Sequence, residues 1–191
     1  MSLRARLRAW RRLPLPASLT FHVEKESESF TADDGSILWA SGYTLVDATT
    51  GKFMKLRDQH FENPHCLLCR VAGVTYRPDA LQDHRFFPGR PVILRPEPTN
   101  PYDQNAVGVW DASGSIQLGY VPREHSERVA MDIASRIPLE GLTLREFRRT
   151  PSGPRLGIHI LIFPAGRHQI VIDVYRGAVN YASKLGTAVG T

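Results

Sequence analysis

The sequence predicts a mainly β (α+β) domain, built as a small β-barrel with one helix packed on it. Short apolar and β-branched segments recur along the chain with turn residues between them. This is typical of small barrels rather than of alternating strands and helices. One segment, which follows Pro122, places apolar residues at helical spacing instead. With 191 residues and 42% hydrophobic side chains, the chain has enough apolar material for a core of ordinary size.

The N-terminal third predicts a β-hairpin that flanks the barrel. Glu24–Ser36 is acidic and polar and ends in an Asp-Asp-Gly turn. We expect Ile37–Leu45 and Phe53–Leu56 to form the two strands of the hairpin. The polar segment Asp47–Lys52, which ends in Thr-Gly just before its lysine, is then the loop between them.

The central third supplies four predicted strands. Cys66–Tyr76 is apolar and β-branched, and Pro91–Arg95 is entered through a Pro-Gly turn. Pro78–Pro88, which lies between them, is expected to be a loop. Ala106–Trp110 and Ser115–Val121 are separated by a short turn that ends in Gly, so they predict a hairpin.

The predicted helix begins at Pro122. Proline suits the first helical turn, because its missing N–H would have no partner there. Val129, Ile133 and Ile137 then recur every four residues. They form a narrow apolar stripe along one side of the helix, which we expect to pack on the barrel.

The C-terminal third predicts three more strands, Leu142–Arg148, Leu156–Phe163 and His168–Tyr175. The residues after Gly177 are expected to form a frayed tail, and the last of the three strands is expected to pair with the rest of the sheet. We therefore divide the chain into a basic tail (1–20), an N-terminal β extension (21–62), the barrel domain (63–164), and a C-terminal strand and tail (165–191).

Charge and cysteine content limit the class of protein. The net charge is +5 with a pI near 9.5, but the basic excess lies in residues 1–20 and 136–191. Electrostatics alone therefore gives little support for a nucleic-acid partner. No apolar run reaches the roughly 18 residues that span a bilayer, so no membrane partner is expected. Two cysteines are typical of a reduced, intracellular protein, cytoplasmic or, in a eukaryote, nuclear.

The most informative motif is Glu97–Val107, with the sequence EPTNPYDQNAV. Its Asn and Asp residues favour tight turns, because their side chains bond to nearby backbone. Tyr102 is flanked by these turn residues, so its ring is expected at a strand mouth rather than in the core. A second motif, Gly119–His125, places Arg123 in the first turn of the helix. There the arginine is either solvated or beside an anion that the helix N-terminus attracts.

These motifs resemble the HIRAN family. The family has a Gly-x-x-Tyr element, a Pro-Gly loop, an acidic-Pro-x-Asn-Pro-Tyr-Asp-x-Asn-Ala segment and a Gly-Tyr-Val-Pro-Arg junction, and this chain has all four in that order. The resemblance covers residues 66–137 and extends to Phe163. It implies an OB-like small barrel of the kind that fork-remodelling helicases carry. In those helicases the module captures the 3′ end of single-stranded DNA.

The resemblance also implies roles for individual residues. Tyr76 and Tyr102 would stack on the terminal bases, Asp103 would accept a hydrogen bond from the terminal 3′-hydroxyl, and Arg123 would hold a phosphate. Each residue has a purely structural alternative as well. Tyr102 and Asp103 would then only close a turn, Tyr76 would cap the barrel mouth, and Arg123 would be a surface charge.

The chain departs from the family pattern in two respects. Some members have a basic residue before the first tyrosine, where this chain has Thr75; Arg77 follows that tyrosine and would substitute. The chain also lacks the P-loop of a helicase motor, because Gly51-Lys52 has no upstream glycine at the required spacing. A stand-alone binding module is therefore expected.

A metal site is weakly indicated by Cys66 and Cys69 alone. A single Cys-x-x-Cys pair is half of a usual structural zinc site, and residues three apart on a strand point to opposite faces. Two buried thiols are the expected interpretation, with no metal and no cofactor.

We expect a nucleic-acid-binding module that captures single-stranded DNA at a 3′ end in DNA repair or replication. A protein partner in DNA processing is compatible with this, and the sequence does not indicate an oligomeric state. Two alternatives stay open. One is a protein-interaction domain that does not bind DNA, and the other is a metal-dependent DNA-processing enzyme. No catalytic constellation is recognisable in the sequence, so an enzyme is not expected.

Overall fold

The structure is a computed structural model that describes residues 20–32, 34–47, 67–165, 169–174 and 177–180. Strands dominate these residues and helices are few, which confirms the mainly β fold class. The strands are β1 Thr20–Thr31, β2 Ile37–Asp47, β3 Leu67–Arg70, β4 Pro91–Pro96, β5 Val107–Asp111, β6 Gln117–Tyr120, β7 Leu139–Arg148, β8 Arg155–Pro164, β9 Gln169–Val174 and β10 Gly177–Asn180. The helices are α2 Pro78–Gln82 and α3 Arg123–Ala134, with 3₁₀ turns η2 Val74–Tyr76 and η3 His84–Phe86.

Six strands form the barrel-like part of the molecule. They are neighbours in the order β3, β8, β7, β4, β5, β6, and each neighbouring pair is antiparallel. No strand ladder joins β6 back to β3, so the sheet is not closed. An isolated bridge between Ala72 and Tyr120 joins these two edges instead, through N···O distances of 2.8 and 2.9 Å. The OB-like architecture is thus confirmed as a curled open sheet rather than a closed barrel.

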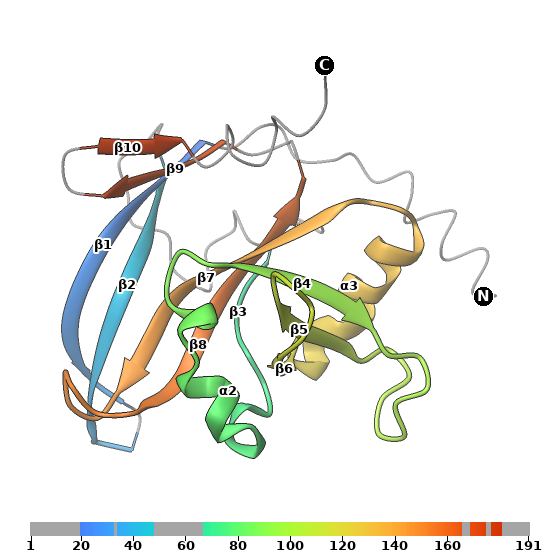
Figure 1. The fold of residues 1–191 in the computed structure, drawn as a ribbon, viewed down its shortest axis with the longest axis horizontal. Helices are drawn as coiled ribbons and strands as arrows, with labels where there is room; N and C mark the ends of the chain where they lie inside the picture. Colours follow the sequence, from blue (N-terminus) through green and yellow to red (C-terminus); the bar gives the residue numbers. More distant parts are fainter. Residues whose placement is uncertain (1–19, 33, 48–66, 166–168, 175–176, 181–191) are drawn as a thin grey trace.

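The flanking strands extend the same sheet. β1 and β2 form an antiparallel hairpin whose turn includes Gly35 at φ 79°. β2 then pairs with β7 next to the barrel-like part, and β9 runs parallel to β1 (Figure 1). Phe53–Leu56, the predicted second strand of the hairpin, lies outside the described residues. Its place beside β2 is taken by β1, which sequence reasoning treated as a polar segment because it has no apolar face of its own.

The core packs the curled sheet against α3, α2 and the two 3₁₀ turns. On β5, Val107 and Val109 are fully buried while Gly108 and Trp110 alternate with them. α3 begins at Arg123, one residue after the predicted start at Pro122, and packs on this core through buried Val129 and half-buried Ile133. Ile137, the last residue of the predicted stripe, follows the end of the helix.

Three local predictions were wrong. The strand predicted at Cys66–Tyr76 ends at Arg70, because Gly73 adopts a left-handed conformation (φ 73°) and turns the chain into η2. The predicted loop at Pro78–Pro88 contains α2 and η3. Both are too short for a helical period to show in the sequence. The predicted frayed tail after Gly177 instead forms β10, which pairs with β9 up to Asn180. None of the described helices is long and apolar enough to cross a membrane.

Candidate functional site

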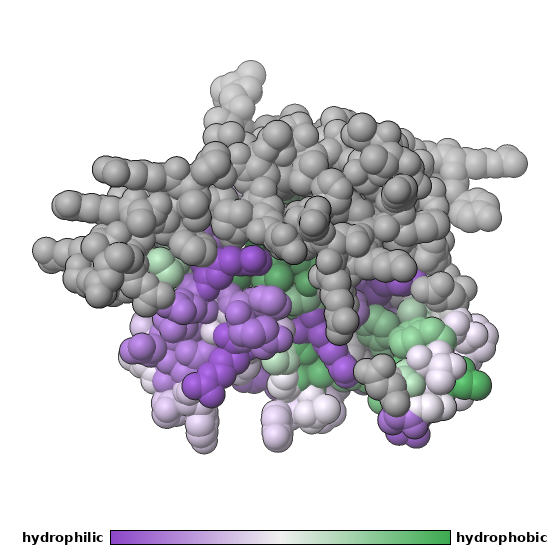
Figure 2. Space-filling model, turned by 180° about the vertical axis from the view of Figure 1, so that it is seen from behind, coloured by the Kyte–Doolittle hydropathy of each residue, from purple (hydrophilic) through white to green (hydrophobic). Residues whose placement is uncertain are grey.

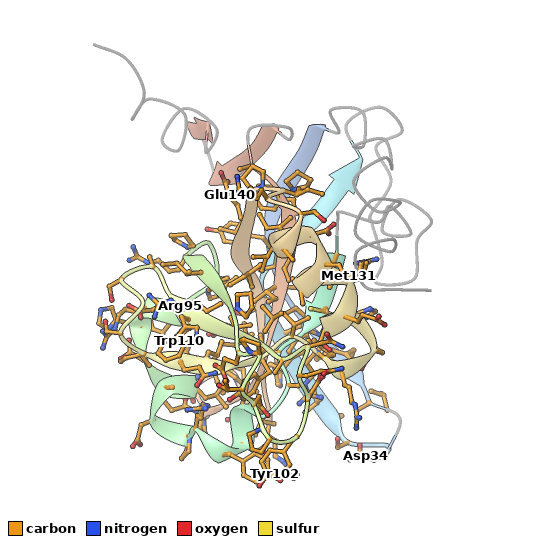
Figure 3. All side chains as sticks on the ribbon, turned by 90° about the vertical axis from the view of Figure 1, so that its right-hand side faces the viewer. Asp34, Arg95, Tyr102, Trp110, Met131 and Glu140 are labelled. Atoms are coloured by element: carbon orange, nitrogen blue, oxygen red, sulfur yellow. The ribbon has the colours of Figure 1, made fainter. Side chains whose placement is uncertain are left out.

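The loop between β4 and β5 is shaped by two short side chains that bond to backbone. Asn100 Oδ1 accepts a hydrogen bond from the Tyr102 N–H at 3.0 Å, and Asp103 Oδ1 accepts one from the Asn105 N–H at 2.8 Å. These are Asx turns, the structures that this residue pattern favours. They leave Tyr102 88% exposed, and Figure 3 shows its side chain at the lower extremity of the molecule.

Asp103 is held in place from a second element. The Ser126 hydroxyl, on the first turn of α3, donates to Asp103 Oδ2 at 2.9 Å and also lies 3.0 Å from the Arg123 carbonyl oxygen. Ser126 is only 2% exposed, so its hydroxyl depends on these partners. Each carboxylate oxygen of Asp103 thus has one donor in the protein. Each oxygen keeps a further lone pair for a ligand.

The loop and the helix together border an open hollow of about 510 Å³. Tyr102 and Asp103 line it from the loop, and Arg123, Ser126 and Glu127 line it from α3; the remaining lining residues are Asn100, Pro101, Gln104 and Asn105. Hydrophilic side chains dominate the part of the surface where α3 lies, at the left of Figure 2. The hollow therefore combines one exposed aromatic ring, two carboxylates and one guanidinium at a helix N-terminus.

Tyr76 and Arg77 do not line this hollow. Tyr76 ends η2 and is 89% exposed. The Arg77 guanidinium carbon lies 5.8 Å from the centroid of the Tyr120 ring, a cation–π contact. Tyr120 in turn donates from its hydroxyl to Glu97 Oε2 at 3.0 Å, at the start of the β4–β5 loop. Tyr120 and Glu97 thus connect Arg77 to the β4–β5 loop, which carries Tyr102 and Asp103.

Glu97 organises the start of this loop. Its carboxylate accepts hydrogen bonds from Gln117 Nε2 at 2.9 Å and from the Tyr120 hydroxyl at 3.0 Å, and Asn100 Nδ2 lies at 3.4 Å. Sequence reasoning quoted Glu97 as part of the motif but missed Gln117 and Ser126. Both partners are about twenty residues away in the chain, so local spacing gave no signal for them.

The structure gives no support to the weak metal candidates. Cys69 is buried in the core on β3, and this burial raises the pKa of its thiol to about 12, so the thiol is protonated at neutral pH. Cys66 lies outside the described residues. Among the residues that are described, no cluster of three or more His, Cys, Asp or Glu side chains could hold a metal ion.

Comparison with protein-family models matches residues 65–142 to the HIRAN domain. The central part of the chain is thus similar to a HIRAN domain. This segment of the chain includes all of the predicted binding residues, Tyr76, Arg77, Tyr102, Asp103 and Arg123, together with Ser126. The resemblance stated from the motifs is thereby confirmed.

One solved structure, described as the HIRAN domain of human HLTF, is similar to this chain. It shares 23% sequence identity with a TM-score of 0.39, and the match covers 52% of this chain and 75% of that chain. A comparison with curated proteins found no match.

Proposed function

We propose that the HIRAN domain of this chain binds single-stranded DNA and captures its 3′ end, in DNA repair or replication. HIRAN domains are a known family of DNA-binding modules. The observation that carries the finer proposal is the hollow between the β4–β5 loop and α3. There an exposed ring, an oriented carboxylate with spare lone pairs and an arginine lie together.

Each group suits one part of a terminal nucleotide. Tyr102 offers an exposed ring on which the last base stacks, a contact worth ~1–3 kcal/mol per base. Asp103 accepts a hydrogen bond from the 3′-hydroxyl, which is stronger than a neutral one because the acceptor is ionised. Arg123, exposed at the N-terminus of α3, contacts the adjoining phosphate.

The charge of the hollow favours a hydroxyl end over a phosphorylated one. Asp103 and Glu127 both line it, and Arg123 is the cation among its lining residues. A terminal 3′-phosphate would carry its negative charge towards the Asp103 carboxylate. Like charges at such short range repel, so a free hydroxyl is the better ligand.

Tyr76 and Arg77 supply the contacts for the preceding nucleotide in this proposal. Tyr76 is as exposed as Tyr102, and the Arg77 side chain lies against Tyr120. We further propose that the chain is a binding module with no catalytic activity of its own. A labelled strand that stays intact with divalent cations present would agree with that, and degradation of the strand would contradict it.

Fluorescence anisotropy of a short 5′-labelled strand tests the proposal. Binding should weaken steeply with salt, and Tyr102→Ala should reduce affinity about 5- to 150-fold, the equivalent of one lost stacking contact. Ile37→Ala serves as the matched control, because Ile37 is 62% exposed but lies on β2, away from the β4–β5 loop in the sheet order.

Equal losses in the two variants would contradict the role of Tyr102. Failure of the unaltered protein to bind any strand at low salt would contradict DNA binding. A protein-interaction domain would then be the better account of the site.

A further inference from the structure

A second aromatic and basic surface lies on the sheet beside the candidate site. In β5, Val107 and Val109 point into the core, so Gly108 and Trp110 lie on the outer face of β4, β5 and β6. The strand register places Arg95 opposite Gly108 and places Trp110 opposite Ile93 on β4. We call the surface around Arg95 and Trp110 the outer β4–β6 face.

The Arg95 side chain contacts two residues of this face. Its guanidinium carbon lies 5.0 Å from the centroid of the Trp110 ring, and its Nη1 donates to the Gly114 carbonyl at 3.0 Å. Figure 3 shows the two side chains next to one another. Gly114 has φ 70°, and a Cβ there would stand 1.9 Å from Arg95 Nη2, so a glycine is required for this arrangement. These contacts orient the guanidinium on the face.

One side of that guanidinium is open. Arg95 is exposed, and within the described part of the chain it forms no ion pair. Its opposite side rests on the indole. An arginine oriented in this way presents a planar surface for stacking on a base and several N–H groups for a phosphate.

The same face continues towards the candidate site. Tyr120 lies opposite Gly108 on the next strand, so Arg95, Gly108 and Tyr120 form one row across the sheet. Arg77 contacts the Tyr120 ring at the far end of this row. Glu97 lies between the two aromatic–arginine pairs, where Gln117 and Tyr120 donate to its carboxylate and offset its charge.

We propose that the outer β4–β6 face binds the nucleotides that precede the captured 3′ end, with Arg95 stacked on Trp110 as its main contact. The inference rests on the proposed function, because it extends the path of the same strand. It adds that the domain binds nucleotides beyond those at the 3′ end. Single-strand-binding barrels hold about 4–16 nucleotides each, which requires contacts beyond one terminal pocket.

The length of the DNA strand provides the test. An end-capture site alone binds one 3′ end per DNA strand, so its affinity should not depend on the length of that strand. We would measure the affinities of 5′-labelled dT3 and dT10, both with free 3′-hydroxyls, by anisotropy. The unaltered protein should bind dT10 about tenfold more tightly than dT3, as one added stacking contact implies. Arg95→Ala should remove most of this gain and leave dT3 binding unchanged.

Arg149→Ala is the matched control, because it removes the same charge from an exposed position in the turn after β7. Thermal melting of both variants would confirm that they fold. Equal affinity for the two strands, or equal effects of the two variants, would overturn the inference and leave end capture intact. If the unaltered protein binds neither dT3 nor dT10, that result would instead overturn the proposed function, and this inference with it.

Discussion

Ser126 connects the two elements that form the candidate site. It lies in the first turn of α3, yet its hydroxyl is bonded to Asp103 in the β4–β5 loop. The Asn105 N–H bonds to the other oxygen of the same carboxylate. Two donors from different elements thus set the direction of the free lone pairs, which is what recognition of a single hydroxyl requires.

Replacing Ser126 with alanine should weaken binding of a strand with a free 3′-hydroxyl about 2- to 12-fold. One hydrogen bond that orients the acceptor is lost, which corresponds to about 0.5–1.5 kcal/mol. Anisotropy measures this, with a 3′-phosphorylated strand as the comparison. An equal loss for both strands would contradict a role in recognising the hydroxyl and would indicate a general effect on folding.

The elements that could be predicted from the sequence are those with a repeating pattern. The alternation on β5 and the proline-initiated helix α3 have strong local signals, and both are present. β1 could not be recognised, because a polar strand becomes ordered only through pairing with β2 and β9. The candidate site shows the same division between local features, which can be predicted, and tertiary contacts, which cannot. The turns around Asn100 and Asp103 are local, whereas the contact between Ser126 and Asp103 depends on how α3 packs.

A row of three basic residues crosses neighbouring strands of the curled sheet. Arg70 on β3 and Arg145 on β7 both lie opposite His159 on β8. The His159 ring packs against the Phe147 ring, with 4.5 Å between the ring centroids. Burial, with a smaller contribution from the two arginines, lowers the pKa of His159 to about 4. His159 is therefore neutral in the folded protein at neutral pH.

This histidine should make the fold sensitive to mild acid. In the unfolded chain it titrates near 6.5, so between pH 6.5 and 4 the unfolded state binds more protons than the folded state. Stability should fall as the pH drops through this window, by about 2 kcal/mol between pH 7.5 and pH 5. Urea unfolding at the two pH values measures the change. His159→Phe should remove most of this dependence, and an unchanged dependence in that variant would contradict the assignment.

At the scale of the whole molecule, the distribution of charge agrees with local capture of a strand end. The basic excess lies outside the central segment, and the hollow beside α3 contains two carboxylates with a single arginine. Broad coating of DNA needs a continuous basic surface. The matched HIRAN segment, residues 65–142, contains the groups proposed to hold the end. The division of the chain at residues 62/63 and 164/165 stays a prediction.

The measurement that tests this account most directly compares two strands that differ only at the 3′ end. The affinity of the protein for a 5′-labelled strand with a free 3′-hydroxyl would be measured by anisotropy beside that for the same strand with a 3′-phosphate. We predict that the free end binds at least about tenfold more tightly, since one charge-assisted hydrogen bond of about 1.5–3 kcal/mol is at stake, and that Asp103→Asn reduces this preference. Equal binding of the two strands would contradict capture of the 3′ end.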